Sequence, residues 1–556
     1  MGKPRTIAVD LIPVLPGAEN GGAKIFTIAL IKALAETHPD TRFILLTRGS
    51  SHDELEILDR RNVSRLLVWS IPKTPSIRQK LLAAGRAAIR SLPSPLTGWL
   101  RSARDLLTAK AAPPLLRSIG ADLLFCPFTA PHYHDLEVPT VCVLYDLQYK
   151  TYPQFFCDEE LAQRERTFTN ATRCASALAV TSDYVRRSVI KTGAIAADRV
   201  FTVHIRLPER LLDSKNSPAV DPFARLGISR FEYLLYPANF WRHKNHELLL
   251  TAFVMARAGG LPQHINLVFT GAPSERVNEL GVAVEALGLK EHVVFAGFLS
   301  DSEFAAVMSE CLAVVFPSLY EGFGMPVVEA MAAGRPVACS DKTSLPEVAG
   351  DAALLFDPRI PSQLAQAIIR IATDDDLRRG LIERGHERAA SFGNPAQMAN
   401  EYWRVFESVL ANAAHVEEIY DDDLSAAPGH VRWQGIYEDG WSGPTISLRY
   451  SRGRPNRSID LELHAPAWLP IKRFTAIVRA ENGRAEICRT ISAGDSPVLQ
   501  VPFGTASGKL EIRITPSFQP CDVIGNGDPR ELMLLVRRLQ LCSGDSSITL
   551  FPPTPE

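Results

Sequence analysis

Short apolar runs, each bounded by glycine, proline or polar residues, recur through roughly the first three quarters of the chain. They are too short for helices and rich in Val, Ile, Leu and Phe, which is typical of parallel strands buried on both faces. Longer segments with helical periodicity lie between them, at 23–36 and 395–412 among others. The pattern predicts an α/β architecture, with strands at Thr6 to Leu11, Arg42 to Thr47, Leu123 to Phe125, Thr140 to Leu144, Tyr233 to Pro237, Asn266 to Thr270, Val293 to Phe298 and Leu312 to Phe316.

One stretch, residues 312–339, shows this organisation most clearly: it reads as strand, glycine loop, helix and strand. Gly322 and Gly324 allow the loop to bend and to bring backbone close to a ligand. Pro326 suits the start of a helix, and Gly334 suits the position just past its end. In such units the ligand lies at the carboxyl ends of the strands, with phosphates near a helix N-terminus.

The last part of the chain follows a different pattern. Apolar and polar residues alternate strictly, as in half-buried antiparallel strands, with about eight such segments separated by Gly, Pro and Asn turns. The sequence therefore predicts a β-sandwich over 428–547, followed by a disordered, proline-rich tail. Four residues of this region are either a sugar-binding platform or, as aromatics in sandwiches more often are, core: Tyr437, Asp439, Trp441 and Trp468.

Composition adds few constraints. The 556 residues predict about three domains of roughly 100–200 residues each. A formal net charge of −2 gives no sign of nucleic-acid binding. Nine scattered cysteines, an odd number, favour reduced thiols in a cytoplasmic protein. No apolar run reaches the ~18 residues of a membrane span.

Residues 65–117 stand apart, with ten Lys or Arg against the single acid Asp105. Apolar residues are interleaved, and prolines divide the segment into short helical pieces. Such a basic amphipathic insertion can lie on an anionic membrane surface. An ordinary helix pair with a solvated basic face explains the pattern equally well.

Three charged residues attract attention in the second α/β half. Glu321 stands in the glycine loop and Glu329 in the helix that follows, and Lys244 lies in the basic turn 239–246 between a strand and a helix. An acid can bind both ribose hydroxyls, and cations with helix N–H groups can bind a diphosphate without metal. Each residue alone is as readily a solvated loop residue or, for Glu329, a helix-start acid.

Together, Phe316 to Pro336 and the following Ser344-Leu345-Pro346-Glu347-Val348 change that balance. The stretch resembles the E-x7-E signature of retaining glycosyltransferases of family 4, including their mannosyltransferase-like bacterial group. The resemblance extends over residues 6–412. It implies the GT-B fold of two Rossmann-like domains, to which the chain adds the sandwich.

The resemblance also implies roles for individual residues. Catalysis would involve Glu321, which faces the sugar, and Asp146. The donor would be held by Gly22, Arg242, Lys244, Gly297, Glu321, Gly322, Phe323, Gly324 and Glu329. Gly22 belongs to the loop facing the diphosphate and the acceptor, and Gly297 to a turn that holds the base. No cofactor and no metal ion are implied.

Two departures from the family pattern limit this transfer of roles. Tyr145 stands where family members often have a His that contacts donor sugar or acceptor, and the family's upstream Arg falls near Ala238. Arg242 could substitute for that Arg. Asp146 matches the motif, but a strand-end cap is an equally good interpretation. Ser182 is expected to cap the helix after Val180-Thr181.

These expectations divide the chain into a first Rossmann-like domain (1–207), a linker, a second domain (223–394), a crossover helix (395–412) and the sandwich. The expected function is transfer of a hexose, with mannose one candidate, from a GDP- or UDP-linked donor to a glycan or lipid-linked glycan in surface polysaccharide synthesis. The expected location is the cytoplasm, at the inner membrane face if the basic segment binds lipid. The sandwich would bind glycan or a protein partner. Two alternatives remain: a scaffold that binds sugar nucleotide without turnover, and a phosphorylase or synthase of the same fold.

Overall fold

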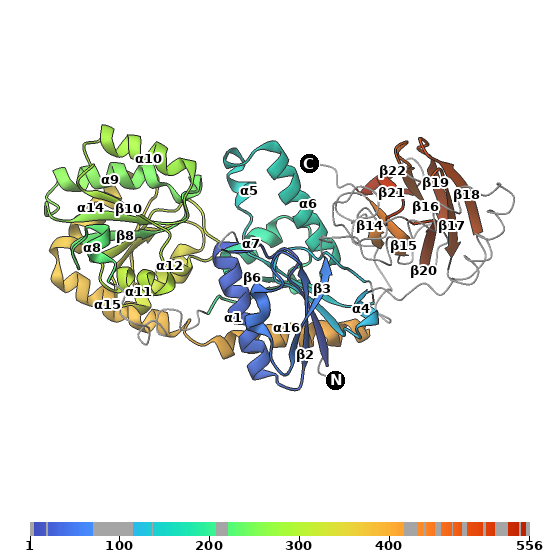
Figure 1. Ribbon diagram of the computed structural model, residues 1–556, viewed down its shortest axis with the longest axis horizontal. Helices are drawn as coiled ribbons and strands as arrows, with labels where there is room; N and C mark the ends of the chain where they lie inside the picture. The colour runs from blue at the N-terminus through green and yellow to red at the C-terminus, as the bar shows by residue number, and fades with distance from the viewer. Residues whose placement is uncertain are drawn as a thin grey trace, which may run out of the picture.

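A computed structural model describes residues 5–17, 20–69, 115–135, 137–206, 221–415, 431–436, 441–450, 457–469, 471–480, 486–503, 508–517, 532–543 and 546–551. These residues form three bodies, with the one nearest the N-terminus in the middle (Figure 1). Residues 208–220 of the interdomain linker predicted around 208–222 lie outside the described residues, as do residues 70–114 of the basic insertion and the candidate sugar-platform residues Tyr437 and Asp439.

The first domain is built on a seven-stranded sheet in the order β3-β2-β1-β4-β5-β6-β7, with every neighbouring pair parallel. Its strands are β1 (Thr6–Asp10), β2 (Arg42–Arg48), β3 (Val63–Trp69), β4 (Leu123–Cys126), β5 (Thr140–Leu144), β6 (Ala177–Val180) and β7 (Val200–Thr202). Its helices are α1 (Gly21–Thr37), η1 (Glu54–Leu58), α4 (Leu115–Ser118), α5 (Gln148–Thr151), η2 (Pro153–Phe155), α6 (Asp158–Cys174), α7 (Asp183–Lys191) and η3 (Ala197–Arg199).

The second domain repeats the plan with a six-stranded parallel sheet in the order β10-β9-β8-β11-β12-β13. Its strands are β8 (Tyr233–Pro237), β9 (Asn266–Thr270), β10 (Val293–Gly297), β11 (Ala313–Phe316), β12 (Val337–Ser340) and β13 (Leu354–Phe356). Its helices are α8 (Phe223–Leu226), η5 (Arg242–Lys244), α9 (His246–Ala258), α10 (Glu275–Ala286), α11 (Asp301–Ser309), α12 (Met325–Ala332), α13 (Leu345–Ala349), α14 (Pro361–Thr373) and α15 (Asp375–Ala390).

Helix α16 (Pro395–His415) follows the second domain and returns to the first, where it lies beside α1 (Figure 1). The rings of Tyr402 and Phe406 pack against Phe125 of β4, at centroid distances of 5.6 and 5.3 Å. Apolar side chains of this helix are therefore buried against the first sheet, as the resemblance implied for the crossover helix. The two parallel sheets confirm the predicted GT-B arrangement.

The third body contains two antiparallel sheets, in the orders β14-β15-β20-β17-β18 and β19-β16-β21-β22. We call it the sandwich. Its strands are β14 (Val431–Ile436), β15 (Ser442–Tyr450), β16 (Arg457–His464), β17 (Arg473–Ala480), β18 (Glu486–Ser492), β19 (Val498–Phe503), β20 (Gly508–Thr515), β21 (Leu535–Ser543) and β22 (Ser546–Phe551). The alternating apolar residues lie inside, with Ile446, Leu461 and Ile512 at 0% exposure.

Three predictions from sequence need correction. The tail after residue 547 is ordered as far as Phe551, because β22 pairs with β21 and completes the second sheet. Residues 65–69, assigned to the basic helical insertion, belong to β3, whose backbone pairs with β2. Helix α1 begins at Gly21 and not at Ala23, because Gly21, at φ +51°, turns the chain directly into the helix.

Within the described residues, no helix is both long enough and apolar enough to span a bilayer. In the same residues, His, Cys, Asp and Glu side chains do not gather in any group of three or more that could hold a metal ion.

Candidate functional site

The carboxyl ends of the two parallel sheets face each other across the boundary between the first and second domains. The segment after β11 in the second domain meets the residues after β5 and β6 in the first. The hydroxyls of Thr181 and Ser182 donate hydrogen bonds to the carbonyl of Gly322, at 3.0 and 2.7 Å. A Cβ atom at Gly322 would lie 2.0 Å from the backbone oxygen of Tyr145, so only glycine fits this approach.

The same segment, Glu321 to Gly324, is also held from within the second domain. The N–H of Glu321 donates to the hydroxyl of Thr343 at 3.0 Å. The Ser344 hydroxyl reaches the carbonyls of Glu321 and Phe323, at 2.9 and 3.1 Å. We call residues 321–324 the glycine loop; its backbone is bound on both sides, which limits the positions that the Glu321 carboxylate can take.

Lys244 and Glu321 form an ion pair in this region. The Lys244 Nζ lies 2.6 Å from Glu321 Oε1, and each side chain is 12% exposed. The ammonium also lies over the ring of Phe316, 5.3 Å from its centroid, and the Tyr236 hydroxyl donates to the Lys244 carbonyl at 2.6 Å. The structure thus brings together two residues that the sequence singled out separately, one after β8 and the other after β11.

The basic turn between β8 and α9 owes its shape to Asn245. This residue adopts a left-handed conformation, with φ +61°, and its side-chain amide donates to the carbonyls of Pro317 and Pro358 at 3.2 and 2.7 Å. The turn is thereby tied to the segment that leads into the glycine loop. Lys244 is partly buried at this position, whereas the side chain of Arg242 is exposed.

Two histidines flank Lys244 and are held neutral. Burial, followed by the charges of Lys244 and His246, lowers the pKa of His243 to about 2. Burial, with Arg276 and Lys244, lowers the pKa of His246 to about 3. His246 is 0% exposed and packs against the rings of Tyr236, Phe240 and Phe269. The positive charge of the turn near Glu321 therefore comes from Lys244 and not from its histidine neighbours.

Asp146 follows β5 in the first domain and accepts the N–H of Gln148 through Oδ1 at 2.9 Å. This contact fits the capping role that the sequence allowed. Burial raises the pKa of Asp146, and the charges of Glu321 and Lys244 both act on it, so the carboxyl lies in the same electrostatic environment as that pair. A partly buried carboxyl near a carboxylate and an ammonium is also compatible with a role towards substrate.

Tyr145 does not occupy the place of a cleft-facing histidine. Its hydroxyl donates to the carbonyl of Pro127 at 2.9 Å, and its ring packs edge to face on Phe26 of α1, at 5.9 Å. Burial raises the pKa of the phenol. The departure from the family motif thus leaves a neutral tyrosine whose hydroxyl is used inside the first domain.

The starts of helices α1 and α12 meet at the domain boundary. A Cβ atom at Gly22 in the first turn of α1 would lie 2.2 Å from the Cε of Met325, the first residue of α12. Gly324 precedes α12 with φ +100°, a conformation that side chains rarely adopt. The unpaired N–H groups of a helix start, together with the helix dipole, favour an anion nearby.

The remaining predicted donor residues are in the second domain. Glu329 is the fifth residue of α12 and only 5% exposed. Phe323 is 4% exposed and packs on Phe392 at 5.5 Å, so it offers backbone and not its ring to a ligand. Gly297 ends β10 with φ +69°, and its carbonyl accepts the N–H of Gly271 at 3.0 Å.

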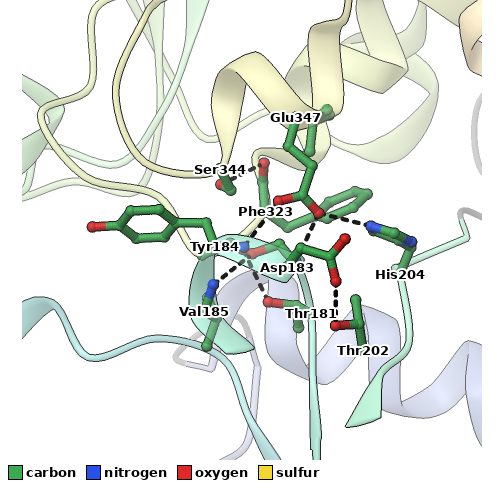
Figure 2. Close-up of polar contacts among 12 residues, drawn as sticks. Thr181, Asp183, Tyr184, Val185, Thr202, His204, Phe323, Ser344 and Glu347 are labelled. Atoms are coloured by element: carbon green, nitrogen blue, oxygen red, sulfur yellow. Dashed lines mark hydrogen bonds and ion pairs between the residues drawn. The ribbon is translucent and has the colours of Figure 1, made fainter. Parts of the chain in front are cut away.

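A further cluster at the boundary escaped prediction. Glu347 of α13 accepts hydrogen bonds from the backbone of Asp183 and Tyr184 in α7 and lies against His204 (Figure 2). Glu347 was visible in the matched motif, but nothing in the sequence indicates a partner 143 residues away. Ser182 caps α7 as predicted, accepting the N–H of Val185 at 3.2 Å, but its second contact, with Gly322, was not foreseen.

The second domain is similar in sequence to a known protein family. The sequence model of the family described as Glycosyl transferases group 1 matches residues 223–388, which lie in the second domain, so the chain contains a domain of this kind. The O-antigen chain mannosyltransferase B of Escherichia coli is 27% identical over 269 residues, 48% of this chain and 68% of that protein. The serotype-specific mannosyltransferase WbdA of Escherichia coli is 28% identical over 331 residues, 55% of this chain and 39% of that protein.

Two solved structures show the same fold. Sucrose-phosphate synthase from Thermosynechococcus elongatus superposes with a TM-score of 0.54 at 21% identity, covering 73% of this chain and all of that one. HepE from Anabaena, in complex with UDP and glucose, gives a TM-score of 0.52 at 17% identity, with the same coverage. At these identities the likeness establishes the fold alone.

Proposed function

We propose that the chain is a retaining glycosyltransferase that moves a hexose from a nucleotide-diphosphate sugar to a glycan or lipid-linked glycan acceptor in surface polysaccharide synthesis. The observation that carries the proposal is the Lys244–Glu321 pair, 2.6 Å apart at the facing carboxyl edges of two Rossmann-like sheets. A cation for the diphosphate and a carboxylate for the sugar stand side by side, where open α/β sheets bind their ligands.

The chemistry requires little more from the protein. The bond between the sugar C1 and the diphosphate oxygen breaks, and the diphosphate leaves with the electron pair. The acceptor oxygen bonds to C1 on the same face, and its proton passes to an oxygen of the departing diphosphate. Lys244 stabilises the negative charge that develops on the leaving group, and Glu321 orients the sugar and favours positive charge at C1.

The helix starts at Gly22 and Met325 supply a second source of positive potential, with no metal ion needed in this scheme. Glu329, on the same helix as Met325, is assigned to the ribose hydroxyls, and the turn at Gly297 to the base. Closure of the two domains over the donor excludes water, which would otherwise hydrolyse the activated sugar.

Mannose is the favoured hexose because both curated relatives described above are named as mannosyltransferases. The UDP in the HepE complex keeps a UDP-linked donor in the test. The panel is therefore GDP-mannose, UDP-glucose and ADP-glucose, first by thermal shift and then by transfer to a mannose-containing acceptor. We expect NMR of the product to show that the anomeric configuration of the donor sugar is retained. We also expect the Glu321→Gln variant to lose transfer.

The panel also separates the alternatives. Donor binding without transfer or hydrolysis would indicate a sugar-nucleotide scaffold. Release of a sugar 1-phosphate from a glycan in the presence of inorganic phosphate would indicate a phosphorylase, and transfer from the nucleotide sugar to a free monosaccharide would indicate a synthase. An inverted product would contradict the retaining mechanism while leaving the glycosyltransferase assignment in place.

The sandwich is proposed to hold the acceptor glycan. Trp468 is 58% exposed, and its ring packs edge to face on Trp441 at 5.9 Å with an interplanar angle of 67°. The loop under Trp468 is fixed, since Lys472 donates to the carbonyls of Ala467 and Leu469 at 3.4 and 3.3 Å. A braced, exposed indole suits a sugar ring, and this exposure argues against the core interpretation for Trp468.

Attraction of the basic residues within 70–114 to anionic lipid completes the proposal, because it would bring the enzyme to a lipid-linked acceptor. Co-sedimentation with phosphatidylglycerol vesicles should rise with the anionic fraction and fall with salt. If sedimentation does not depend on lipid charge, the proposed attraction to the membrane is wrong, whereas the proposed transfer reaction is not affected.

A further inference from the structure

Glu347 links the two Rossmann-like domains through one carboxylate. Its Oε1 accepts the N–H of Asp183 at 2.7 Å and lies 2.8 Å from Nε2 of His204, and its Oε2 accepts the N–H of Tyr184 at 2.9 Å. All three partners belong to the first domain, whereas Glu347 belongs to the second. Figure 2 shows the side chain reaching from α13 to the start of α7.

The contacts are of the stronger kind. The first N–H groups of a helix have no partner within the helix, and the helix dipole makes its start positive. Glu347 satisfies two of these groups in α7 with a charged acceptor, and charge-assisted hydrogen bonds are about twice as strong as neutral ones. The side chains of Glu347 and His204 are 21% and 30% exposed, so solvent screens the pair only in part.

The start of α7 in turn binds the glycine loop. Ser182, the residue before α7, and Thr181 donate to the Gly322 carbonyl. On the other side, Thr343 and Ser344 hold the backbone of Glu321 and Phe323. Ser344 also stands just before α13, the helix that carries Glu347.

A closed chain of contacts therefore runs from Glu347 through the start of α7 to Gly322, then through Glu321 and Ser344 back to α13. The Glu321 carboxylate belongs to a residue whose backbone lies inside this chain. Displacement of α7 from the second domain would withdraw the hydroxyls that hold Gly322, next in sequence to Glu321.

We propose that Glu347 is a positioning residue for sugar transfer: it holds the start of α7 against the second domain, so that Thr181 and Ser182 fix the glycine loop with Glu321 in place. Glu347 itself touches no reactant. The inference rests on the proposed function, because the step it serves is the one assigned to Glu321.

Phe323 adds aromatic packing to this contact region between the first and second domains, which we call the seam. Its ring lies 6.3 Å from the imidazole of His204, and Phe392 lies 5.9 Å from that imidazole. His204 thereby packs against two aromatic rings of the second domain, which also pack on each other at 5.5 Å, while it contacts Glu347. This area combines a histidine–carboxylate contact, helix capping and aromatic packing.

The test compares Glu347→Ala with Glu347→Gln, using Glu387→Gln as control. Glu387 is an exposed acid on α15 of the same domain. Transfer is measured with whichever of GDP-mannose and UDP-glucose the wild type turns over, and nucleotide affinity with GDP or UDP alone. Thermal unfolding of each variant establishes that it is folded.

Glu347→Ala should lower kcat about 10- to 100-fold, the effect of a displacement of about 1 Å at a catalytic group. Affinity for the nucleoside diphosphate should stay within about threefold, because the variant leaves Lys244 and Glu329 in place. Glu347→Gln keeps one acceptor oxygen and should recover part of the loss. The control should match the wild type.

A double variant tests whether Glu347 acts through α7, which a purely structural role would not require. Thr181→Val removes a hydroxyl that binds Gly322 and keeps a similar shape. If Glu347 acts through this contact, the double variant should lose little more activity than the poorer single variant.

Three outcomes overturn the inference: a Glu347→Ala kcat within twofold of wild type, a loss equal in kcat and nucleotide affinity, or multiplicative losses in the double variant. If Glu347→Ala fails to fold, Glu347→Gln is judged by the same criteria. Should Glu321→Gln also keep full transfer, the proposed function fails first; if Glu321→Gln is inactive and Glu347→Ala is active, only the inference fails.

Discussion

Two regions of the molecule are built in contrasting ways: the seam, where the two Rossmann-like domains meet, and the sandwich. At the seam, backbone and side-chain polar groups from many elements converge on a few residues of the glycine loop. The sandwich has a separate apolar core, and among the described residues Lys509 contacts Glu137 of the first domain at 4.0 Å. The seam is a site built from loops, whereas the sandwich is a body built from alternating strands.

The difference teaches where function can be concentrated. In a parallel sheet all strands point the same way, so the loops after their carboxyl ends gather at one edge, and two such edges can enclose a donor. In antiparallel sheets the connections are divided between two ends, and binding depends on what individual exposed side chains offer. We therefore expect substitutions at the seam to affect turnover, and changes in the sandwich to affect acceptor use.

Glu321→Gln should have the largest effect. The substitution keeps the size of the side chain and removes its charge, so transfer should fall about 10²- to 10³-fold, the usual cost of losing one preorganised electrostatic group. Binding of GDP or UDP, measured by calorimetry, should change little. Transfer kinetics equal to the wild type would show that the carboxylate is not part of the chemistry.

Lys244→Ala should come next. Loss of a charged hydrogen-bond donor costs about 1.5–3 kcal/mol, or roughly 10- to 100-fold in diphosphate affinity. Affinity for the bare nucleoside, measured in parallel, should hardly change, and turnover should fall with the diphosphate. Arg242→Ala is the matched control: its side chain is exposed, and an unchanged affinity would identify it as a surface residue.

Removal of residues 416–556 tests the sandwich as a whole. Because the core of the sandwich is separate from that of the two Rossmann-like domains, the remaining chain should fold and transfer sugar to a short soluble acceptor. Trp468→Ala in the full chain should raise KM for a polymeric acceptor about 2- to 10-fold, as expected for one lost aromatic contact. Val498→Ala, which changes another exposed residue of the sandwich, is the control. A truncated protein that no longer binds donor would make the sandwich part of the catalytic unit.

The smallest effect concerns pH. Burial favours protonation of Glu347, but the hydrogen bonds from His204, Asp183 and Tyr184 outweigh it and hold the pKa of Glu347 below its ordinary 4.5. The contribution of the carboxylate to stability is therefore complete above pH 4.5 and is lost as the pH falls through the lowered pKa. The difference in Tm between wild type and Glu347→Gln should shrink as the pH is lowered below about 4.5; a constant difference would mean that the charge is not what stabilises the seam.

The sequence predicted those features that depend on local pattern. The apolar run at Leu312 to Phe316, the glycines of the loop and Pro326 placed β11 and α12 correctly, and alternation placed buried positions such as Ile446 and Ile512 inside the sandwich. The family signature pointed to Glu321 and Lys244 as members of one site. The structure shows the two in contact, while their roles in catalysis and donor binding stay predictions.

What the sequence did not predict depends on long-range placement. The pairing of Glu347 with His204 requires the docking of two domains, which no local pattern encodes. The inward turn of Tyr145 depends on the carbonyl of Pro127 and the ring of Phe26, and the strand at Ser546–Phe551 on pairing with β21. Such contacts are decided by tertiary packing, after the local preferences of each segment are satisfied.

Gly322 also determines how closely the two domains can approach, because it has no side chain. A Cβ atom at this position would lie 2.0 Å from the Tyr145 oxygen. A Gly322→Ala substitution would therefore push the two domains apart without changing Lys244 or Glu321. Under the proposed function, a protein held open at this boundary would still bind its donor but would admit water, so hydrolysis of the donor would rise relative to transfer. The absence of a side chain at Gly322 thus bears on the ratio of sugar transfer to donor hydrolysis under the proposed function.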